Sequence, residues 1–279
     1  MWQKINIFVR THTVLSVFLL MVLFSLLTTA AGLPILIGDI VGETIGMPVF
    51  IAYQLVLSVI GIFLMKKLQV LDEDDFKFKN IGKGFLLGWV MLLIAAIMFV
   101  MNLTSPPEGG FLTPTPLYLI TVILYPFIVS ALFEEVVFRG LVLKILLKKM
   151  GGSKKGIIGA FITSAALFGV VHSVHLFWDT PLSVFSSVVF ATGGGFFLGA
   201  IYLRTKTLIV PILLHALFNL SSMIFWAFTL NGPSTVTEQT LADFGMVFLL
   251  GVLPLTIAAF VLLRKVRPEE IVRPSVSLS

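Results

Sequence analysis

The sequence predicts an all-α membrane protein, a polytopic bundle of about eight transmembrane helices that forms one domain over residues 1–279. Its composition is 58% hydrophobic and only 12% charged, which is far more apolar than a soluble globular domain. The apolar residues also gather in runs of roughly 20, the length that crosses a bilayer as a helix. A third observation, the distribution of Lys and Arg, tests the order of the spans.

Eight apolar runs are separated by short polar connections. The predicted spans cover approximately residues 14–37, 47–65, 84–103, 116–149, 156–177, 182–203, 207–230 and 244–263. A signal peptide is the alternative for the first run, because a basic start and an apolar stretch precede Thr28-Thr29-Ala30-Ala31. The run is long for the apolar region of a signal peptide, which favours a span.

The basic residues follow the predicted topology. The end of the fourth span is ambiguous, and residues 139–155 are counted here as an inside segment. If the spans alternate from an inside N-terminus, all 19 Lys and Arg residues then fall in inside segments, namely the N-terminus, 66–83, 139–155, 204–206 and the C-terminus. This positive-inside pattern predicts that both ends of the chain are cytoplasmic, in an integral protein that we expect in the plasma membrane. The partners expected are therefore the lipid bilayer and no nucleic acid. The absence of Cys excludes disulfides and cysteine catalysis.

One connection and one predicted span have recognisable patterns. Residues 66–83 hold five Lys and the acidic run Asp72-Glu73-Asp74-Asp75, which predicts a solvated loop or an interfacial helix. In the sixth span, Gly195 and Gly199 have the small-residue spacing that allows two helices to pack closely.

Glu134 and Glu135 are the acidic residues that lie inside apolar, helix-like sequence. A charge in the bilayer centre costs roughly 2.5–3.5 kcal/mol on insertion scales, so each needs a partner or a function. Arg139 lies four residues after Glu135 and shares its helix face, whereas Glu134 is turned about 100° away. We interpret Glu135 and Arg139 as a structural pair and Glu134 as the group available for chemistry.

Polar side chains also occur at helical spacing in two other spans. Phe168 and His172 share one face, and His215 and Asn219 share another. Depths can be compared at about 1.5 Å per residue: His172 lies roughly 25 Å from the inside end of its span and His215 roughly 13 Å. Glu134 lies roughly 22 Å deep only if its helix continues to the lysines before residue 150.

A meeting of these groups therefore requires a long, tilted or broken fourth helix. Taken singly, each has an ordinary explanation: an interhelical hydrogen bond for either His, packing for Asn219, a buried bridge for Glu135 and Arg139. Taken together, a carboxylate, two imidazoles and a carboxamide suggest a hydrolytic site. His12, His175 and Asp179 are interpreted as residues at the edges of spans.

At these residues the chain resembles the CAAX protease and bacteriocin-processing enzymes, a family of intramembrane endopeptidases. The family pattern is E-E-x-x-x-R, then F-x-x-x-H, then H-x-x-x-N. Here it reads Glu134-Glu135-x-x-x-Arg139, Phe168-x-x-x-His172 and His215-x-x-x-Asn219, in the same order and on separate spans. The resemblance covers about residues 117–220, and the first three spans and the last match no motif.

The resemblance implies cleavage of a membrane-associated peptide or protein, of the CAAX type on a prenylated substrate or of the bacteriocin type. It implies that Glu134, helped by His172, activates water, and that His215 and Asn219 stabilise the oxyanion. The supporting residues that it implies are Glu135, Arg139 and Phe168.

Members of this family are often called metalloproteases, so the resemblance allows a divalent metal such as zinc. Glu134, His172 and His215 would then form a His₂Glu ligand set. A Glu that binds metal is poorly placed as a base, however, and the sequence lacks H-E-x-x-H. Two other functions stay open: a non-catalytic scaffold or bacteriocin self-immunity protein, and a proton-coupled transporter, which embedded Glu and His would suit.

Overall fold

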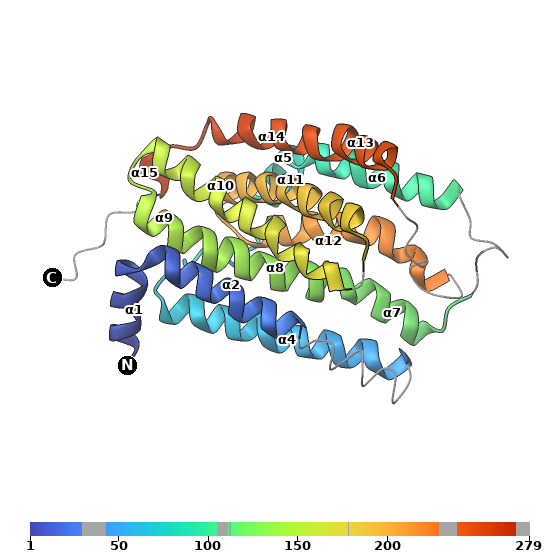
Figure 1. The fold of residues 1–279 in the computed structure, drawn as a ribbon, viewed down its shortest axis with the longest axis horizontal. Coiled ribbons are helices and arrows are strands. Elements are labelled where there is room, and N and C mark those ends of the chain that lie inside the picture. The colour runs from blue at the N-terminus through green and yellow to red at the C-terminus, as the bar shows by residue number, and fades with distance from the viewer. Residues whose placement is uncertain (30–42, 105–110, 112, 178, 229–238, 272–279) are drawn as a thin grey trace.

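The computed structural model describes residues 1–29, 43–104, 111, 113–177, 179–228 and 239–271. Over these residues the protein is a bundle of helices without a strand, which confirms the all-α, polytopic fold. Most helices run roughly along the long axis of the molecule in Figure 1, and α1 (Trp2–Thr11) and α15 (Pro268–Ile271) lie at the same end.

Five helices among the described residues are long and apolar enough to cross a membrane, and up to seven spans result if each of two bent pairs counts as one. The five are Gly46–Lys67, Pro116–Met150, Lys154–Phe177, Pro181–Thr205 and Leu241–Leu263. Where the seventh span was predicted, α12 (Ile209–Met223) is a shorter apolar helix. The predicted span ends at residues 30–37 and 229–230 lie outside the described residues.

Each of the two bends between helices is accompanied by a contact with another helix. Helix α1 meets α2 (Thr13–Thr29) at 113°, and its Asn6 Nδ2 donates to Lys67 O at 2.9 Å, at the end of α4 (Glu43–Lys67). Helices α5 (Ile81–Leu87) and α6 (Trp89–Thr104) meet at 69°. A Cβ at Gly88 would lie 2.7 Å from Leu214, so glycine allows the bend to approach α12.

The fourth helix is continuous from Pro116 to Met150, 35 residues. At about 1.5 Å per residue it is about 50 Å long, well beyond a hydrocarbon core of about 30 Å. The predicted long helix is therefore confirmed. Its parts are α7 (Pro116–Tyr125), η1 (Pro126–Leu132), α8 (Phe133–Glu135), η2 (Val136–Leu143) and α9 (Lys144–Met150).

Two wider π-helical stretches, η1 and η2, interrupt this helix on either side of α8. The first begins at Pro126, which has no backbone N–H to complete the α-helical ladder. Such π-helical turns are frequent at functional sites. The single α-helical turn between them carries Glu134 and Glu135.

Helix α10 (Lys154–Val171) continues as the short 3₁₀ helix η3 (His172–Phe177) and packs along α11 (Pro181–Thr205). A Cβ at Gly195 would lie 3.1 Å from Phe168 and 3.2 Å from Ala165. A Cβ at Gly199 would lie 3.4 Å from Phe161. The close helix packing predicted from these two glycines is confirmed.

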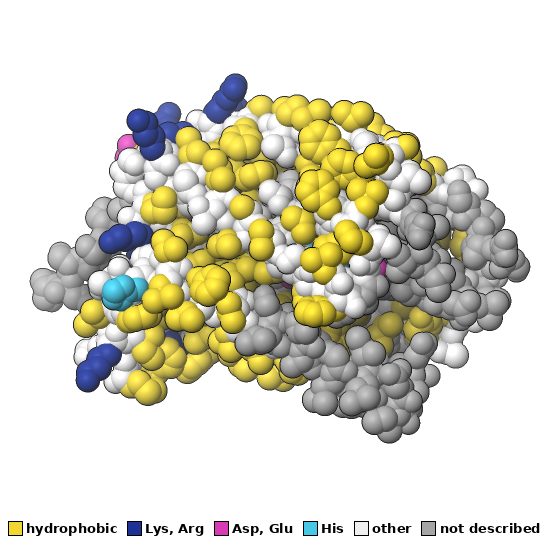
Figure 2. Space-filling model, viewed as in Figure 1, with side chains coloured by type: hydrophobic (Ala, Val, Ile, Leu, Met, Phe, Trp, Pro, Cys, Tyr) yellow, Lys and Arg dark blue, Asp and Glu magenta, His cyan; other side chains and the backbone are white. Residues whose placement is uncertain are grey.

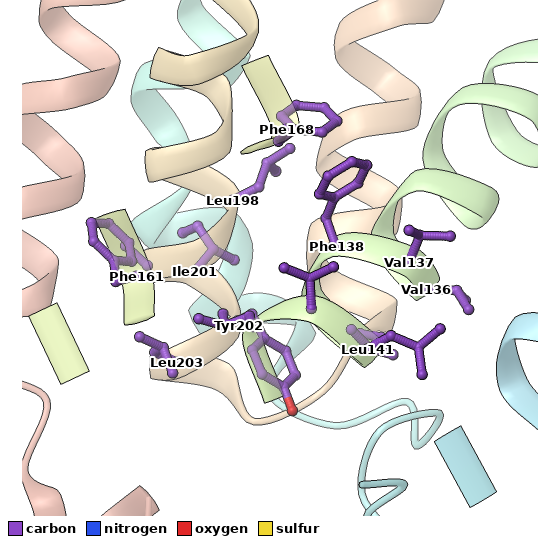
Figure 3. Packing of buried hydrophobic residues seen from close by; sticks show 14 of the residues in the cluster. Val136, Val137, Phe138, Leu141, Phe161, Phe168, Leu198, Ile201, Tyr202 and Leu203 are labelled. Atoms are coloured by element: carbon purple, nitrogen blue, oxygen red, sulfur yellow. The ribbon is translucent and has the colours of Figure 1, made fainter. Parts of the chain in front are cut away.

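The core lies where η2, α10 and α11 meet, and Figure 3 shows Phe138 and Phe168 next to each other there. Their ring centroids are 4.8 Å apart, edge to face. The last long helix covers the other side of α11; its parts are α13 (Leu241–Val247), η5 (Phe248–Val252) and α14 (Leu253–Leu263). Helix α12 packs on η1 and α6, which places His215 against the glutamate pair.

The acidic run Asp72-Glu73-Asp74-Asp75 lies before α5. It was predicted to be solvated, but its last residue is buried. Asp75 is only 1% exposed. Its Oδ2 lies 2.5 Å from Lys144 Nζ, its Oδ1 accepts from the Tyr202 hydroxyl at 3.0 Å, and its carbonyl accepts from Leu208 N at 2.7 Å. The prediction is wrong for Asp75 because three helices supply donors that replace water.

The surface agrees with a protein that lies in a bilayer. Figure 2 shows hydrophobic side chains over the middle of the visible face, and Lys and Arg side chains gathered towards the end that holds α1, α9 and α15. Charged side chains at one end and apolar side chains along the middle fit the polarity gradient of a membrane. We call this the basic end of the bundle.

Candidate active site

The site forms where three separate elements meet: α8 of the long fourth helix, the junction of α10 with η3, and the middle of α12. Each contributes polar side chains at the spacing noted in the sequence. The long fourth helix brings Glu134 and Glu135 to the depth of His215, as the sequence required. Apolar packing around the three elements, including Phe133 and Phe138, which are 5% exposed each, excludes bulk water from most of the site.

Glu135 lies at the centre of a buried network. It is fully buried, and its Oε1 accepts from Arg139 Nη1 at 2.8 Å. The same oxygen lies 2.9 Å from Nδ1 of His215, so a carboxylate at this position accepts the Nδ1 proton. The contact between Glu135 and Arg139 was predicted from their spacing. The contact with His215, 80 residues away, was not, because it depends on how α12 packs.

Arg139 is held by three neighbours. Besides Glu135, its Nη2 donates to Gly195 O at 3.3 Å, and its guanidinium carbon lies 4.7 Å from the centre of the Phe168 ring. A cation over an aromatic face is stabilised by the ring quadrupole. These contacts give Phe168 a definite supporting role.

Glu134 points to a different environment from its neighbour. Its side chain is 26% exposed, and Oε2 lies 3.8 Å from Nε2 of His215. This distance exceeds a direct hydrogen bond, which spans about 2.7–3.2 Å. It leaves room for a water molecule or a substrate oxygen to make hydrogen bonds with both groups.

Glu134 and His172 line one cavity of about 140 Å³. Because a water molecule occupies about 30 Å³ in the liquid, the cavity has room for several. The remaining lining is mostly apolar and comes from α2, the fourth helix and the end of α10; it comprises Met21, Phe24, Phe133, Val137, Phe138, Val171, Val174 and His175. The cavity is therefore a small polar spot within an apolar wall.

The hydrogen bonds of His172 define its tautomer. Nδ1 lies 2.9 Å from the carbonyl oxygen of Phe168. A carbonyl accepts hydrogen bonds and cannot donate them, so the proton must be on Nδ1. Nε2 of the neutral ring is then an acceptor, able to take a hydrogen bond from water in the cavity.

His175 is a cavity residue that the sequence analysis placed at the edge of its span. Its side chain is 44% exposed and lies 3.6 Å from Asp179, as an edge residue would. It also stacks on His172, with ring centroids 6.0 Å apart and planes 7° apart. The sequence feature that could have placed His175 in the cavity is its position three residues after His172, which is one turn of a 3₁₀ helix such as η3.

Asn219 lies one turn after His215 on α12, on the same face. It is half-buried, and its side-chain amide makes no hydrogen bond to another described residue. The structure thus brings together Glu134, Glu135, Arg139, His172 and His215 through contacts or a shared cavity. It places Asn219 next to them along the helix without a direct hydrogen bond.

The predicted metal ligands do not form a cluster in this structure. Among the described residues, no group of three or more His, Cys, Asp or Glu side chains is close enough to hold an ion. The Nδ1 hydrogen bonds of His172 and His215 are of the kind that also orients a metal-binding imidazole through its second nitrogen. The zinc ligand set named above stays a prediction, and no step below uses a metal.

A family model described as Rce1-like, type II CAAX prenyl endopeptidase, matches residues 116–221 of the chain. The matched region begins at the fourth helix and ends in α12, and so contains the three motifs and the site. Comparisons with curated proteins and with solved structures gave no match. The resemblance predicted from the motifs is confirmed over residues 116–221, which match a family of intramembrane CAAX-type proteases.

Proposed function

We propose that the protein is an endopeptidase in which Glu134 activates a water molecule to hydrolyse a peptide bond of a membrane-associated substrate. The observation that supports this most is the position of Glu134. It shares a cavity with Nε2 of His172, and its other side faces Nε2 of His215 across 3.8 Å. A carboxylate beside space for water, with imidazoles on both sides, is the arrangement that general-base catalysis needs.

The first step is addition of water. A water in the cavity donates one hydrogen bond to Glu134 and a second to Nε2 of His172. As its oxygen attacks the carbonyl carbon of the substrate, Glu134 takes its proton. This forms a tetrahedral intermediate with a negative oxygen. Glu134 then gives the proton to the amide nitrogen, the C–N bond breaks, and the amine leaves.

The developing oxyanion is stabilised from α12. His215 donates from Nε2, and Asn219, one turn further, donates from its unoccupied amide. Donors fixed in an apolar site stabilise such charge strongly, since they need no reorganisation and water does not screen them. Because Nδ1 of His215 already lies against Glu135, donation from Nε2 requires a proton on both ring nitrogens of His215.

Three further residues support the site by positioning other side chains: Glu135, Arg139 and Phe168. Glu135 holds His215 by Nδ1, which turns Nε2 towards Glu134. Arg139 neutralises Glu135, and the Phe168 ring supports the guanidinium. A similar arrangement, in which a buried carboxylate orients an imidazole, is used by hydrolases of unrelated folds.

The substrate that we propose is a peptide or protein held at the membrane, cut in a CAAX-type or bacteriocin-type processing reaction. We further propose that the enzyme resides in the plasma membrane with both chain ends in the cytoplasm. The positive-inside distribution of Lys and Arg supports this orientation.

The test compares peptide termini in membranes that contain the wild-type protein, Glu134→Ala or His172→Ala. New termini should occur with the wild-type protein and be absent with both variants. His12→Ala is a matched control, since His12 is exposed at the N-terminal end of the chain, outside the site. Membranes that contain this control should have the same peptide termini as membranes that contain the wild-type protein.

The same comparison separates the competing functions. A scaffold or self-immunity protein would retain its biological effect in both site variants and would generate no termini. A transporter would move its substrate only with a proton gradient. Termini that persist in folded, membrane-inserted Glu134→Ala would refute the proposed enzyme.

A further inference from the structure

An apolar groove lies on the outer surface of the described part of the bundle, and its lining shares no residue with the cavity of the active site. It has a volume of about 1110 Å³ and lies between α5–α6 and α13–α14, with α11 at its floor. Figure 1 shows these segments along one edge of the bundle. We call it the α6–α14 groove. Its walls include Leu93, Ile97, Leu250, Ile257 and Val261, all of them exposed and apolar.

The part of the groove nearest the basic end has the length of a hydrocarbon chain in one leaflet. This part runs from Leu253 to Leu262 on α14 and covers about 14 Å at about 1.5 Å per residue. One leaflet contributes about 15 Å, half of the hydrocarbon core of about 30 Å. The rest of the groove continues along η5 and α13, and Gln239 and Asp243 line its other end.

A cluster of cations closes the groove at the basic end of the bundle. Lys83 lies one turn before the lining residue Leu86, and Lys265 follows Leu262 by three positions. Arg204 links them: its carbonyl accepts from Lys83 Nζ at 3.0 Å, and its Nη1 donates to Lys265 O at 3.1 Å. These two hydrogen bonds bring the start of α5, the end of α11 and the segment after α14 together at Arg204.

These cations retain unused hydrogen-bonding capacity. In the described part of the chain, the Arg204 side chain uses only Nη1 in a hydrogen bond, to Lys265 O. This leaves Nη2 as a donor for a phosphate oxygen. Within the described part of the chain, no Asp or Glu forms an ion pair with Lys83, Arg204 or Lys265.

We propose that the α6–α14 groove and this cluster bind one anionic phospholipid. The phosphate lies at Arg204 and Lys83, and an acyl chain lies along α6 and α14. Only a molecule with a negative head and a long apolar chain matches both parts. Cationic sites near a membrane surface favour anionic lipids by about 1 kcal/mol per Lys or Arg, about 5-fold each. The site is separate from the proposed cleavage of peptides and does not depend on it.

The test uses the full-length protein in phosphatidylcholine vesicles that contain a minor fraction of phosphatidylglycerol. After extraction in mild detergent, native mass spectrometry counts the lipids that stay bound. The wild-type protein should retain phosphatidylglycerol in preference to phosphatidylcholine. The double variant Lys83→Gln/Arg204→Gln should lower this retention about 30-fold, the product of two charges at about 1 kcal/mol each.

The matched control is Lys149→Gln/Arg267→Gln, which removes two exposed charges outside the cluster and should retain phosphatidylglycerol as the wild type does. A second pair tests the groove at constant charge. Leu250→Trp fills it and should reduce retention, whereas Leu55→Trp on α4, also exposed, should not. Equal retention of the two lipids by the wild type, equal losses in the two charge variants, or full retention by Leu250→Trp would each overturn the site.

Discussion

Two adjacent glutamates of this chain have different environments, although they are consecutive residues of one helix. Glu135 is fully buried and accepts hydrogen bonds from Arg139 and His215, while Glu134 faces a cavity and has no direct hydrogen bond to either. The difference follows from helix geometry, because successive side chains point about 100° apart. It leads to opposite expectations for stability and for activity.

Glu135→Ala should destabilise the protein by about 3–5 kcal/mol, because it leaves Arg139 charged, buried and without its partner. Glu134→Ala should leave the stability nearly unchanged, since it removes a partly exposed carboxylate. The measurement is denaturation of both purified variants in the same detergent. Equal stability losses in the two variants would contradict the division of roles.

At the scale of elements, the fold depends on two contacts that fix helices relative to each other. One is Asp75, whose side chain and carbonyl join the loop before α5 to α9, α11 and the start of α12. The other is Gly195, where α11 approaches α10 and the Arg139 guanidinium. Neither residue lines the cavity at Glu134, but both contact helices that carry residues of the candidate site.

Asp75→Ala should lower the free energy of unfolding by about 1–3 kcal/mol, the cost of leaving buried donors without an acceptor. Lys144 Nζ and the Tyr202 hydroxyl would lose their shared partner, while Asp72 would still pair with Lys144 at 2.8 Å. The matched control is Asp74→Ala, which removes ion pairs with Lys77 and Lys79 at the surface. Such exposed pairs contribute less than about 1 kcal/mol. Denaturation curves that move equally for both variants would contradict the structural role of Asp75.

Gly195→Ala should destabilise the protein by about 1–3 kcal/mol, because the added Cβ would press on Phe168 and Ala165. Gly194→Ala is the control in the same helix, since a Cβ there meets nothing within 4 Å. Its stability should stay the same or rise by up to about 1 kcal/mol, as Ala favours helices over Gly. Displacement of Phe168 in Gly195→Ala should also lower the activity, which a cleavage assay would detect.

The elements also show what sequence alone could predict. Contacts within one helix follow from spacing, so the Glu135–Arg139 pair, the shared face of Phe168 and His172 and the long fourth helix were predictable. Contacts between helices were not: His215 with Glu135, Arg139 with Gly195, and the buried position of Asp75 each join segments more than 50 residues apart. The bend at Gly88 was hidden for the same reason, because it depends on the approach of α12.

For the whole molecule, the Lys and Arg residues other than the buried Arg139 follow one side of the predicted topology, and α1 and α15 lie at the same end of the bundle. The chain has no Cys, so single cysteines are unique probes of orientation. The variants Glu73→Cys and Glu269→Cys should not react with a membrane-impermeant maleimide in intact cells, whereas Thr113→Cys should react. Labelling at Glu73 or Glu269 in sealed cells would contradict the cytoplasmic orientation.

The central claim is that Glu134 is the base that activates water, and the rate of peptide cleavage by Glu134→Gln tests it most directly. The substrate is one identified from the comparison of membrane termini, and both proteins are purified and shown to have the same unfolding midpoint. General-base catalysis contributes about 10²–10⁴-fold, and we expect the variant to be slower by at least the lower value. A folded Glu134→Gln protein that cleaves within about 10-fold of the wild-type rate, well below that contribution, would contradict the account.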